Sequence, residues 1–110
     1  MARKDPREPF TRIDVKEADE MMNDGAAVID VREAHEYSAG HVPGAKLIPV
    51  NTVYAKRDEL PRDKDLIFVC AVGQRSALAC EMAAAAGLTR LYNLEGGTDG
   101  WIKSGMPAEK

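Results

Sequence analysis

Short apolar runs alternate along the chain with segments whose apolar positions recur at helical spacing. Runs of strand length cover residues 26–29, 45–48 and 66–69, and a further strand pattern covers 90–94. The runs 26–29 and 66–69 are continuously apolar, which is typical of strands that are covered on both faces of a sheet. Strands that alternate with helices predict an α/β fold with a mainly parallel sheet and helices on both of its faces.

Helical segments occupy the spaces between the predicted strands. Asp14 and Glu17 form a capping-box pattern before a helix that we expect over residues 15–22. Two more helices are expected over 34–39 and 77–86, and the second is rich in alanine, which allows a helix to lie close to a sheet. A glycine follows each segment, as the C-termini of helices commonly require.

The remaining segments complete one domain. Residues 1–9 mix charges with proline and lack periodicity, so we expect a mobile tail or a short strap against the surface. The folded domain covers 10–110 and begins with a short strand over 11–13. Residues 49–60 are compatible with a helix, and a short helix after the last strand places Trp101 as an anchor of the core.

Length, charge and cysteine content narrow the choice of function. The 110 residues suit one domain, and 45% apolar with 30% charged residues is the balance of a soluble globular protein. A net charge of -3 argues against nucleic acid as a partner. No apolar stretch is long enough to span a membrane, and the N-terminus lacks a hydrophobic signal region, so we expect a cytoplasmic protein. The two cysteines lack C-x-x-C spacing and suit a reducing compartment.

The residues that carry chemistry gather where the strand 66–69 passes into the alanine-rich helix. There Cys70 precedes a loop that is unlike a core segment: Ala71, Val72, Gly73, Gln74, Arg75 and Ser76. Inward-pointing N–H groups of such a loop, together with the first turn of the helix, stabilise an anion. Gly73 can take a positive φ angle and Arg75 adds a positive charge, so we expect a thiolate nucleophile in a substrate-binding loop. A small buried cysteine without reactivity is the alternative.

Polar residues that follow the second predicted strand are candidates to support this loop. Asp30 and Arg32 stand at the C-terminal end of that strand, so they border the site or form a structural ion pair. We favour the ion pair, with Glu36 as the partner of Arg32 or a loop amide as the partner of Asp30. His41 is a candidate general base for the cysteine, although a histidine before a Val-Pro-Gly turn more often holds the turn.

Other patterns give no further site. His35 and His41 lack the accompanying cysteines or the His-x3-His spacing of a metal centre, so we expect no metal ion. Cys80 lies inside the alanine-rich helix, and we expect it to be buried and inert rather than a resolving thiol for the loop cysteine. The glycine pair at 96–97 lacks the G-x-G-x-x-G spacing of a phosphate-binding loop.

Three separated stretches of this sequence resemble the rhodanese family. The loop that begins at Cys70 resembles the rhodanese active-site loop. The second stretch is Val28-Ile29-Asp30-Val31-Arg32-Glu33 with Glu36-Tyr37 and Gly40-His41-Val42-Pro43-Gly44-Ala45. The third stretch is Leu94-Glu95-Gly96-Gly97-Thr98-Asp99-Gly100-Trp101 with Gly105-Met106-Pro107. The resemblance implies a single rhodanese-like domain with a five-stranded sheet in the order 1-5-4-2-3. It also implies supporting roles around the loop for four residues: Asp30, Arg32, Glu36 and His41.

The same resemblance implies a sulfurtransferase of the thiosulfate or persulfide type. Cys70 would attack the sulfane sulfur of a donor such as thiosulfate or a persulfide and carry that sulfur as a persulfide. A thiophilic acceptor such as cyanide or a thiol would then remove it, and a protein can serve as donor or acceptor as well. No metal ion or organic cofactor is implied, and neither nucleic acid nor a membrane is an expected partner.

Two other functions are weighed against sulfur transfer. Phosphatases and arsenate reductases with the rhodanese fold carry a loop that resembles C-x5-R, whereas Cys70 and Arg75 form the shorter C-x4-R, which suits a sulfur atom better than a phosphoryl group. A non-catalytic interaction or sulfur-carrier module usually lacks the cysteine, which is present here. Ala71 and Val72 leave only Arg75 in the loop to meet a doubly charged donor, so we expect modest activity with thiosulfate.

Overall fold

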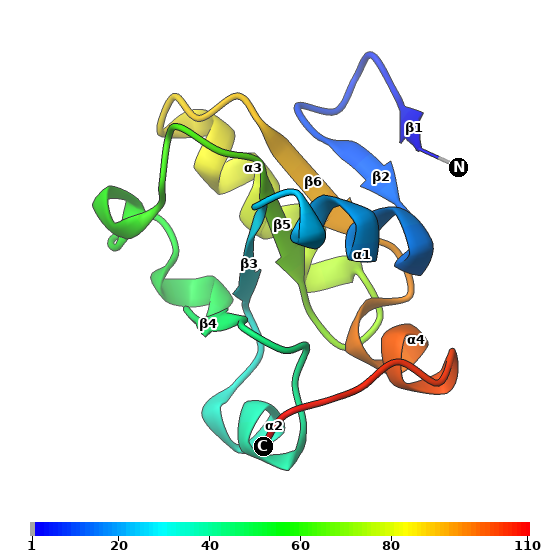
Figure 1. Ribbon diagram of the computed structural model, residues 1–110. Coiled ribbons are helices and arrows are strands. Elements are labelled where there is room, and N and C mark those ends of the chain that lie inside the picture. Colours follow the sequence, from blue (N-terminus) through cyan, green and yellow to red (C-terminus); the bar gives the residue numbers. More distant parts are fainter. Residues whose placement is uncertain (1) are drawn as a thin grey trace.

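Six strands form a single sheet in the order β1-β2-β6-β5-β3-β4 (Figure 1). The computed structural model describes residues 2–110. All neighbouring strands pair in parallel except β1 and β2. Without β1, the order is the one expected from the rhodanese resemblance, so that expectation is confirmed. The strands are β1 Arg3–Lys4, β2 Thr11–Ile13, β3 Ala27–Asp30, β4 Lys46–Leu47, β5 Leu66–Val69 and β6 Leu91–Leu94.

The first strand, β1, lies in residues that we expected to form a mobile tail or a surface strap. It pairs antiparallel with β2, with Arg3 opposite Arg12. The guanidinium group of Arg3 pairs with the carboxylate of Glu95, and that of Arg12 lies 3.8 Å from the same carboxylate. A short, charged edge strand of this kind protects a sheet from pairing with other chains. The segment therefore lies along the sheet as a strap, while its mobility stays a prediction.

Residues 2–110 contain four α-helices and two 3-10 helices, and all but the last α-helix lie between strands. In the helix α1, the capping box is present, because the amide of Glu17 donates to Asp14 Oδ1 over 2.8 Å and the amide of Asp14 donates to Glu17 Oε1 over 3.0 Å. The helices are α1 Val15–Asn23, α2 Ala34–Ala39, α3 Gln74–Ala85 and α4 Gly97–Lys103, with η1 Val50–Thr52 and η2 Arg57–Glu59 as the 3-10 helices.

The segment 49–60 does not form the helix that its composition allows. It contains η1 and η2 instead, and neither Asn51 nor Thr52 acts as an N-cap. The amide of Val50 donates to the carbonyl oxygen of Val31 over 2.9 Å, which ties the start of the segment to the chain after β3. Contact with the segment that follows β3, rather than helical propensity, therefore determines the backbone conformation of residues 49–60.

Apolar side chains pack on both faces of the sheet, as the continuous strand patterns predicted. Along β5, Leu66 and Phe68 face a cluster that contains the residues of α3, and Ile67 and Val69 face a cluster that contains α1 and Trp101. Figure 1 shows α1 and α3 on opposite sides of the sheet. The indole Nε1 of the buried Trp101 donates to the carbonyl oxygen of Pro107 over 2.7 Å, so Trp101 holds the C-terminal segment against the core.

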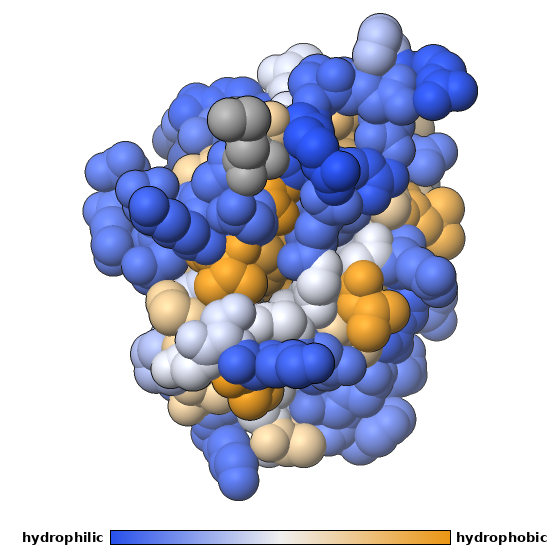
Figure 2. Space-filling view, turned by 90° about the vertical axis from the view of Figure 1, so that its right-hand side faces the viewer, coloured by the Kyte–Doolittle hydropathy of each residue, from blue (hydrophilic) through white to orange (hydrophobic). Residues whose placement is uncertain are grey.

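The surface is largely hydrophilic where the N-terminal strands lie. Figure 2 shows hydrophobic residues on that face as separate patches within a hydrophilic surface. The large hydrophobic side chains that are exposed in residues 2–110 are Tyr54, Val72, Leu78 and Ile102. Within the same residues, no helix combines the length and the apolar character that crossing a membrane requires.

Candidate active site

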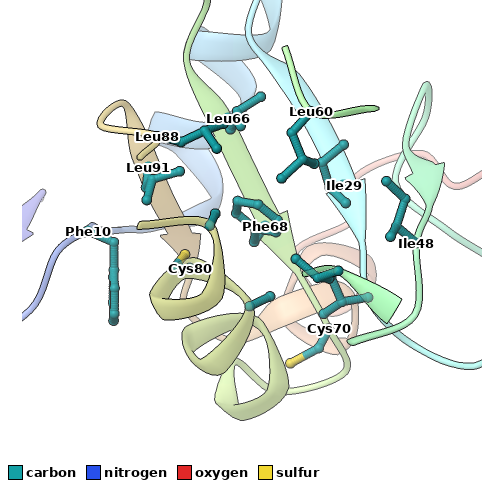
Figure 3. Packing of buried hydrophobic residues seen from close by; sticks show 14 residues of the cluster. Phe10, Ile29, Ile48, Leu60, Leu66, Phe68, Cys70, Cys80, Leu88 and Leu91 are labelled. Carbon is teal, nitrogen blue, oxygen red and sulfur yellow. The ribbon is translucent and has the colours of Figure 1, made fainter. Parts of the chain in front are cut away.

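The candidate site lies where β5 ends and α3 begins. Side chains alternate between the two faces of a strand, so Cys70 continues the face of Leu66 and Phe68 and is directed toward α3. Figure 3 shows its sulfur at the edge of the cluster, beside the first turn of α3. Gly73 is the N-cap of that helix with a φ angle of 101°, the left-handed conformation that the sequence predicted for this position.

The helix α3 begins earlier than the alanine-rich pattern indicated. We expected a helix over 77–86, whereas α3 starts at Gln74, so Gln74, Arg75 and Ser76 form its first turn. Backbone N–H groups in the first turn of a helix have no partner within that helix. The earlier start thus brings amides of the first turn close to the cysteine.

Hydrogen-bond donors surround the sulfur of Cys70. The amide of Gly73 donates to Sγ over 3.0 Å, and the hydroxyl oxygen of Ser76 lies 3.4 Å from Sγ. Burial raises the pKa of the Cys70 thiol, but the contact with the Ser76 hydroxyl group and the hydrogen bonds from the amides of Ser76, Gly73 and Val72 outweigh the effect of burial. The pKa of Cys70 therefore lies below its ordinary value, and the thiolate is the stabilised form.

Cys80 has the opposite environment. Its side chain lies within the apolar cluster, near Phe10 and Leu91 in Figure 3. Its thiol donates to the carbonyl oxygen of Tyr92 over 3.6 Å, and burial raises its pKa. A neutral, buried thiol is a poor nucleophile, which agrees with the inert role that we expected for Cys80.

Asn93 on β6 orients the hydroxyl group of Ser76. The Asn93 side chain is buried, and its Nδ2 donates to the carbonyl oxygen of Gly73 over 3.1 Å. This contact directs Oδ1 toward Ser76, whose hydroxyl donates to it over 2.5 Å. The sequence analysis missed Asn93, although a polar residue within the apolar strand pattern 90–94 was a signal for it.

The first turn of α4 supports the cysteine loop from behind. The amide of Thr98 donates to the carbonyl oxygen of Cys70 over 2.7 Å, and that of Asp99 donates to Ala71 over 3.1 Å. A Cβ atom on Gly97 would lie 2.4 Å from the carbonyl oxygen of Cys70. Only glycine allows this close approach, so the pair 96–97 supports the loop in a way that we did not predict.

Arg75 points its guanidinium group at Glu36 on α2. The two groups form a bidentate pair, with distances of 2.8 Å from Nη1 to Oε1 and 2.9 Å from Nη2 to Oε2. Glu36 raises the pKa of Arg75 most strongly, and Cys70 makes a smaller contribution. Our interpretation of Arg75 therefore changes, because its charge is shared mainly with Glu36 and the thiolate depends mainly on the loop amides.

Asp30 and Arg32 form a structural ion pair with each other, and the loop amide that we expected as a partner of Asp30 is present as well. Arg32 Nη2 lies 2.8 Å from Asp30 Oδ2, and the amide of Arg32 donates to Asp30 Oδ1 over 3.0 Å. Both side chains are buried, and Arg32 also donates to the carbonyl oxygen of Gly40 over 2.8 Å. The pair thus connects the end of β3 to the end of α2, the helix that carries Glu36.

His41 contacts α2 and the C-terminal segment. Its ring stacks on Tyr37 at a centroid distance of 3.7 Å, and its Nδ1 donates to the carbonyl oxygen of Tyr37 over 2.9 Å. Its backbone pairs with Glu109 near the C-terminus. These contacts agree with a structural role, so we assign His41 no proton transfer. Within residues 2–110, no group of three or more His, Cys, Asp or Glu side chains is arranged to hold a metal ion.

Comparison with known proteins identifies the family. The family described as "Rhodanese-like domain" matches residues 14–104. The chain belongs to this family. The matched residues include the cysteine loop, the helix α2 and the first turn of α4.

Named relatives cover most of this rhodanese-like domain. The "Thiosulfate sulfurtransferase GlpE" of Actinobacillus pleuropneumoniae serotype 7 is 32% identical over 103 residues, which are 93% of this chain and 95% of that protein. A "Sulfurtransferase" of Allochromatium vinosum is 32% identical over 80 residues, which are 73% of this chain and 75% of that protein. Among solved structures, a rhodanese-related protein from Thermoplasma volcanium has 34% identity and a TM-score of 0.82, covering 89% of this chain and 96% of its own.

The Cys70 thiolate of this rhodanese-like domain should form at a lower pH than an ordinary cysteine thiolate. Hydrogen bonds favour the charged form of the thiol, so the folded-state pKa is lowered and the thiolate appears earlier as the pH rises. Thiolate absorbance of the Cys80→Ala variant should rise with a midpoint below that of the same variant unfolded in urea. An equal or higher midpoint in the folded protein would contradict the hydrogen-bond pattern around Sγ.

Proposed function

We propose that this rhodanese-like domain is a sulfurtransferase that carries sulfane sulfur as a persulfide on Cys70. The thiolate attacks the outer sulfur of thiosulfate, a new S–S bond forms, and the S–S bond of the donor breaks. The electron pair of that bond leaves with sulfite. Cyanide or a thiolate then attacks the outer sulfur of the persulfide, which releases thiocyanate or a new persulfide and restores the Cys70 thiolate.

The observation that carries this proposal is the set of donors around Sγ. The amide of Gly73 lies 3.0 Å from the sulfur, and the amides of Val72 and Ser76 also favour the thiolate. The persulfide is an anion at neutral pH as well, so the same donors stabilise the product of the first step. Neither step requires a side chain to donate or accept a proton, which agrees with the structural contacts of His41.

The relatives support the same reaction. The Actinobacillus protein is named a thiosulfate sulfurtransferase and the Allochromatium protein a sulfurtransferase, and each is 32% identical to this chain. A phosphatase activity has less support, because the loop has the shorter C-x4-R spacing and the Arg75 guanidinium pairs with Glu36. A phosphoryl group would need that guanidinium as a partner.

We expect thiosulfate to be a weak donor. The two residues that follow the cysteine, Ala71 and Val72, are neutral, and Val72 is 57% exposed. A dianion therefore meets an apolar surface and a cation that is already paired. The reacting group of a persulfide, from a small thiol or from a protein, carries one negative charge where thiosulfate carries two, so it suits this surface better. We propose that the protein acts in the cytoplasm.

The first half-reaction tests the proposal. With thiosulfate in excess and no acceptor, the protein should release one equivalent of sulfite per chain and then stop, because the persulfide cannot turn over. Addition of cyanide should start steady release of thiocyanate with ping-pong kinetics. A KM for thiosulfate in the low micromolar range would contradict weak donor binding, and sulfite release that continues without an acceptor would contradict the persulfide.

A further inference from the structure

The pair of Arg75 and Glu36 connects two helices beside the reactive sulfur. Arg75 lies in the first turn of α3, one residue before Ser76, and Glu36 lies in the first turn of α2. The side chains are 36% and 26% exposed, so the pair meets solvent and not only the core. A donor that approaches the cysteine loop therefore encounters a guanidinium group whose two Nη atoms both contact a carboxylate.

The structure holds Glu36 in this position from a second side. Its Oε1 accepts a hydrogen bond of 3.0 Å from the amide of Glu33, in addition to the one from Arg75. The Arg75 guanidinium, and then the Glu33 amide, lower the pKa of Glu36 to about 2. The carboxylate is therefore charged at every pH at which the protein works, and the neutralisation of Arg75 is permanent.

The loop from Cys70 to Ser76 contains no other cation. A further carboxylate acts on Arg75, namely that of Glu33, which precedes α2. The cysteine loop thus offers an anionic donor no positive side chain that is unpaired. Backbone dipoles are left to attract an anionic donor, and a second negative charge on that donor gains no ionic partner.

We propose that Glu36 determines donor specificity by neutralising Arg75, so that the protein favours sulfur donors of low charge over dianions such as thiosulfate. This inference rests on the proposed sulfur transfer through Cys70. Glu36 is a positioning residue, because it acts on the donor through the guanidinium group and does not touch the reacting atoms. The donor class is a persulfide or another sulfane compound with at most one negative charge near the transferred sulfur.

Two donors of similar chemistry but different charge test this inference. Thiosulfate is a dianion that releases sulfite, and methanethiosulfonate is a monoanion that releases methanesulfinate when the Cys70 thiolate takes its outer sulfur. In the Glu36→Gln variant, the amide oxygen of glutamine can still accept the bond from Glu33, but the charge of Arg75 is free. We expect KM for thiosulfate to fall about tenfold and KM for methanethiosulfonate about threefold, because the electrostatic free energy scales with donor charge.

Three controls separate this effect from a general change in charge or shape. Glu59→Gln removes a carboxylate from another exposed pair, in which Glu59 Oε1 lies 3.0 Å from Lys46 Nζ, and should leave both KM values unchanged. In an Arg75→Gln background, Glu36→Gln should give a smaller gain for both donors, because it then removes only the repulsion by the carboxylate and frees no guanidinium group. Raising the salt concentration should reduce the gain for thiosulfate more than the gain for methanethiosulfonate.

The outcomes distinguish this inference from the proposed function. If Glu36→Gln leaves the ratio of the two KM values unchanged, or raises KM for thiosulfate, Glu36 does not set donor charge and the inference is wrong. If the unmodified protein takes sulfur from neither donor, the sulfur transfer itself is wrong. A gain for thiosulfate that is equally large in the Arg75→Gln background would also overturn the inference, because the effect would not pass through the guanidinium group.

Discussion

Replacing Cys70 with serine should reduce sulfur transfer by about a thousandfold or more. Serine keeps the size of the side chain and its contacts with Gly73 and Ser76, but a hydroxyl is not a thiolate at neutral pH and cannot form a persulfide. The rate of thiocyanate formation from thiosulfate and cyanide measures the loss. Circular dichroism and urea unfolding should show that the variant is folded.

Cys80→Ala is the matched control for this variant. Cys80 is the second free cysteine, it is buried, and burial raises its pKa, so it should make no contribution to turnover. We expect the Cys80→Ala variant to keep the rate of the unmodified protein, with some loss of stability from the small cavity in the core. Activity that survives in Cys70→Ser but disappears in Cys80→Ala would show that Cys80, and not Cys70, is the nucleophile.

Gly97→Ala should destabilise the protein by about 2–4 kcal/mol and disrupt the active-site loop. The new methyl group would lie 2.4 Å from the carbonyl oxygen of Cys70 and 2.5 Å from that of Ala71, and both contacts involve backbone that cannot rotate away. The φ angle of 59° at Gly97 adds strain for any residue with a Cβ atom. Urea unfolding measures the loss of stability, and sulfite release without an acceptor measures the damage to the loop.

Gly100→Ala, in the same helix α4, is the control for this substitution. A Cβ atom on Gly100 would have no neighbour within 4 Å, and alanine favours a helix more than glycine does. We therefore expect unchanged or slightly higher stability and unchanged sulfite release. Equal stability of the Gly97→Ala and Gly100→Ala variants would show that the close approach between α4 and the loop is not required.

The sheet and the position of the nucleophile could be predicted from the sequence because the signals are local. A continuous apolar run predicted β5, an alanine-rich segment predicted α3, and a cysteine with a glycine three residues later lies between them. The order of the strands came from the rhodanese resemblance and not from the pattern. The structure agrees with it and adds only β1 at one edge.

The partners of the charged residues could not be predicted, because they depend on contacts between distant segments. Glu36 and Arg75 are 39 positions apart, and nothing in the local pattern of either residue names the other. We considered Arg32 as a partner of Glu36, whereas Arg32 pairs with Asp30, two residues away. This difference in partners matters for the proposed donor specificity, because Glu36 neutralises the charge of Arg75.

The contacts that support the cysteine loop could not be predicted from the sequence pattern either. The pair 96–97 was recognised only as unlike a phosphate-binding loop, but its function is close contact with the cysteine loop. Asn93 on β6 orients the hydroxyl group of Ser76 on α3 through a hydrogen bond. Both features act on the loop from behind, so its geometry depends on β6 and α4 as much as on the residues that follow Cys70.

In the proposed mechanism, a ring of loop amides stabilises a sulfur anion on Cys70. The most direct test is intact-protein mass spectrometry after incubation with thiosulfate. We predict the mass of one added sulfur atom, which disappears after treatment with cyanide, is retained in Cys80→Ala and is absent in Cys70→Ala. An added sulfur that remains in Cys70→Ala, or an unmodified protein after incubation with both thiosulfate and a small persulfide, would contradict this account.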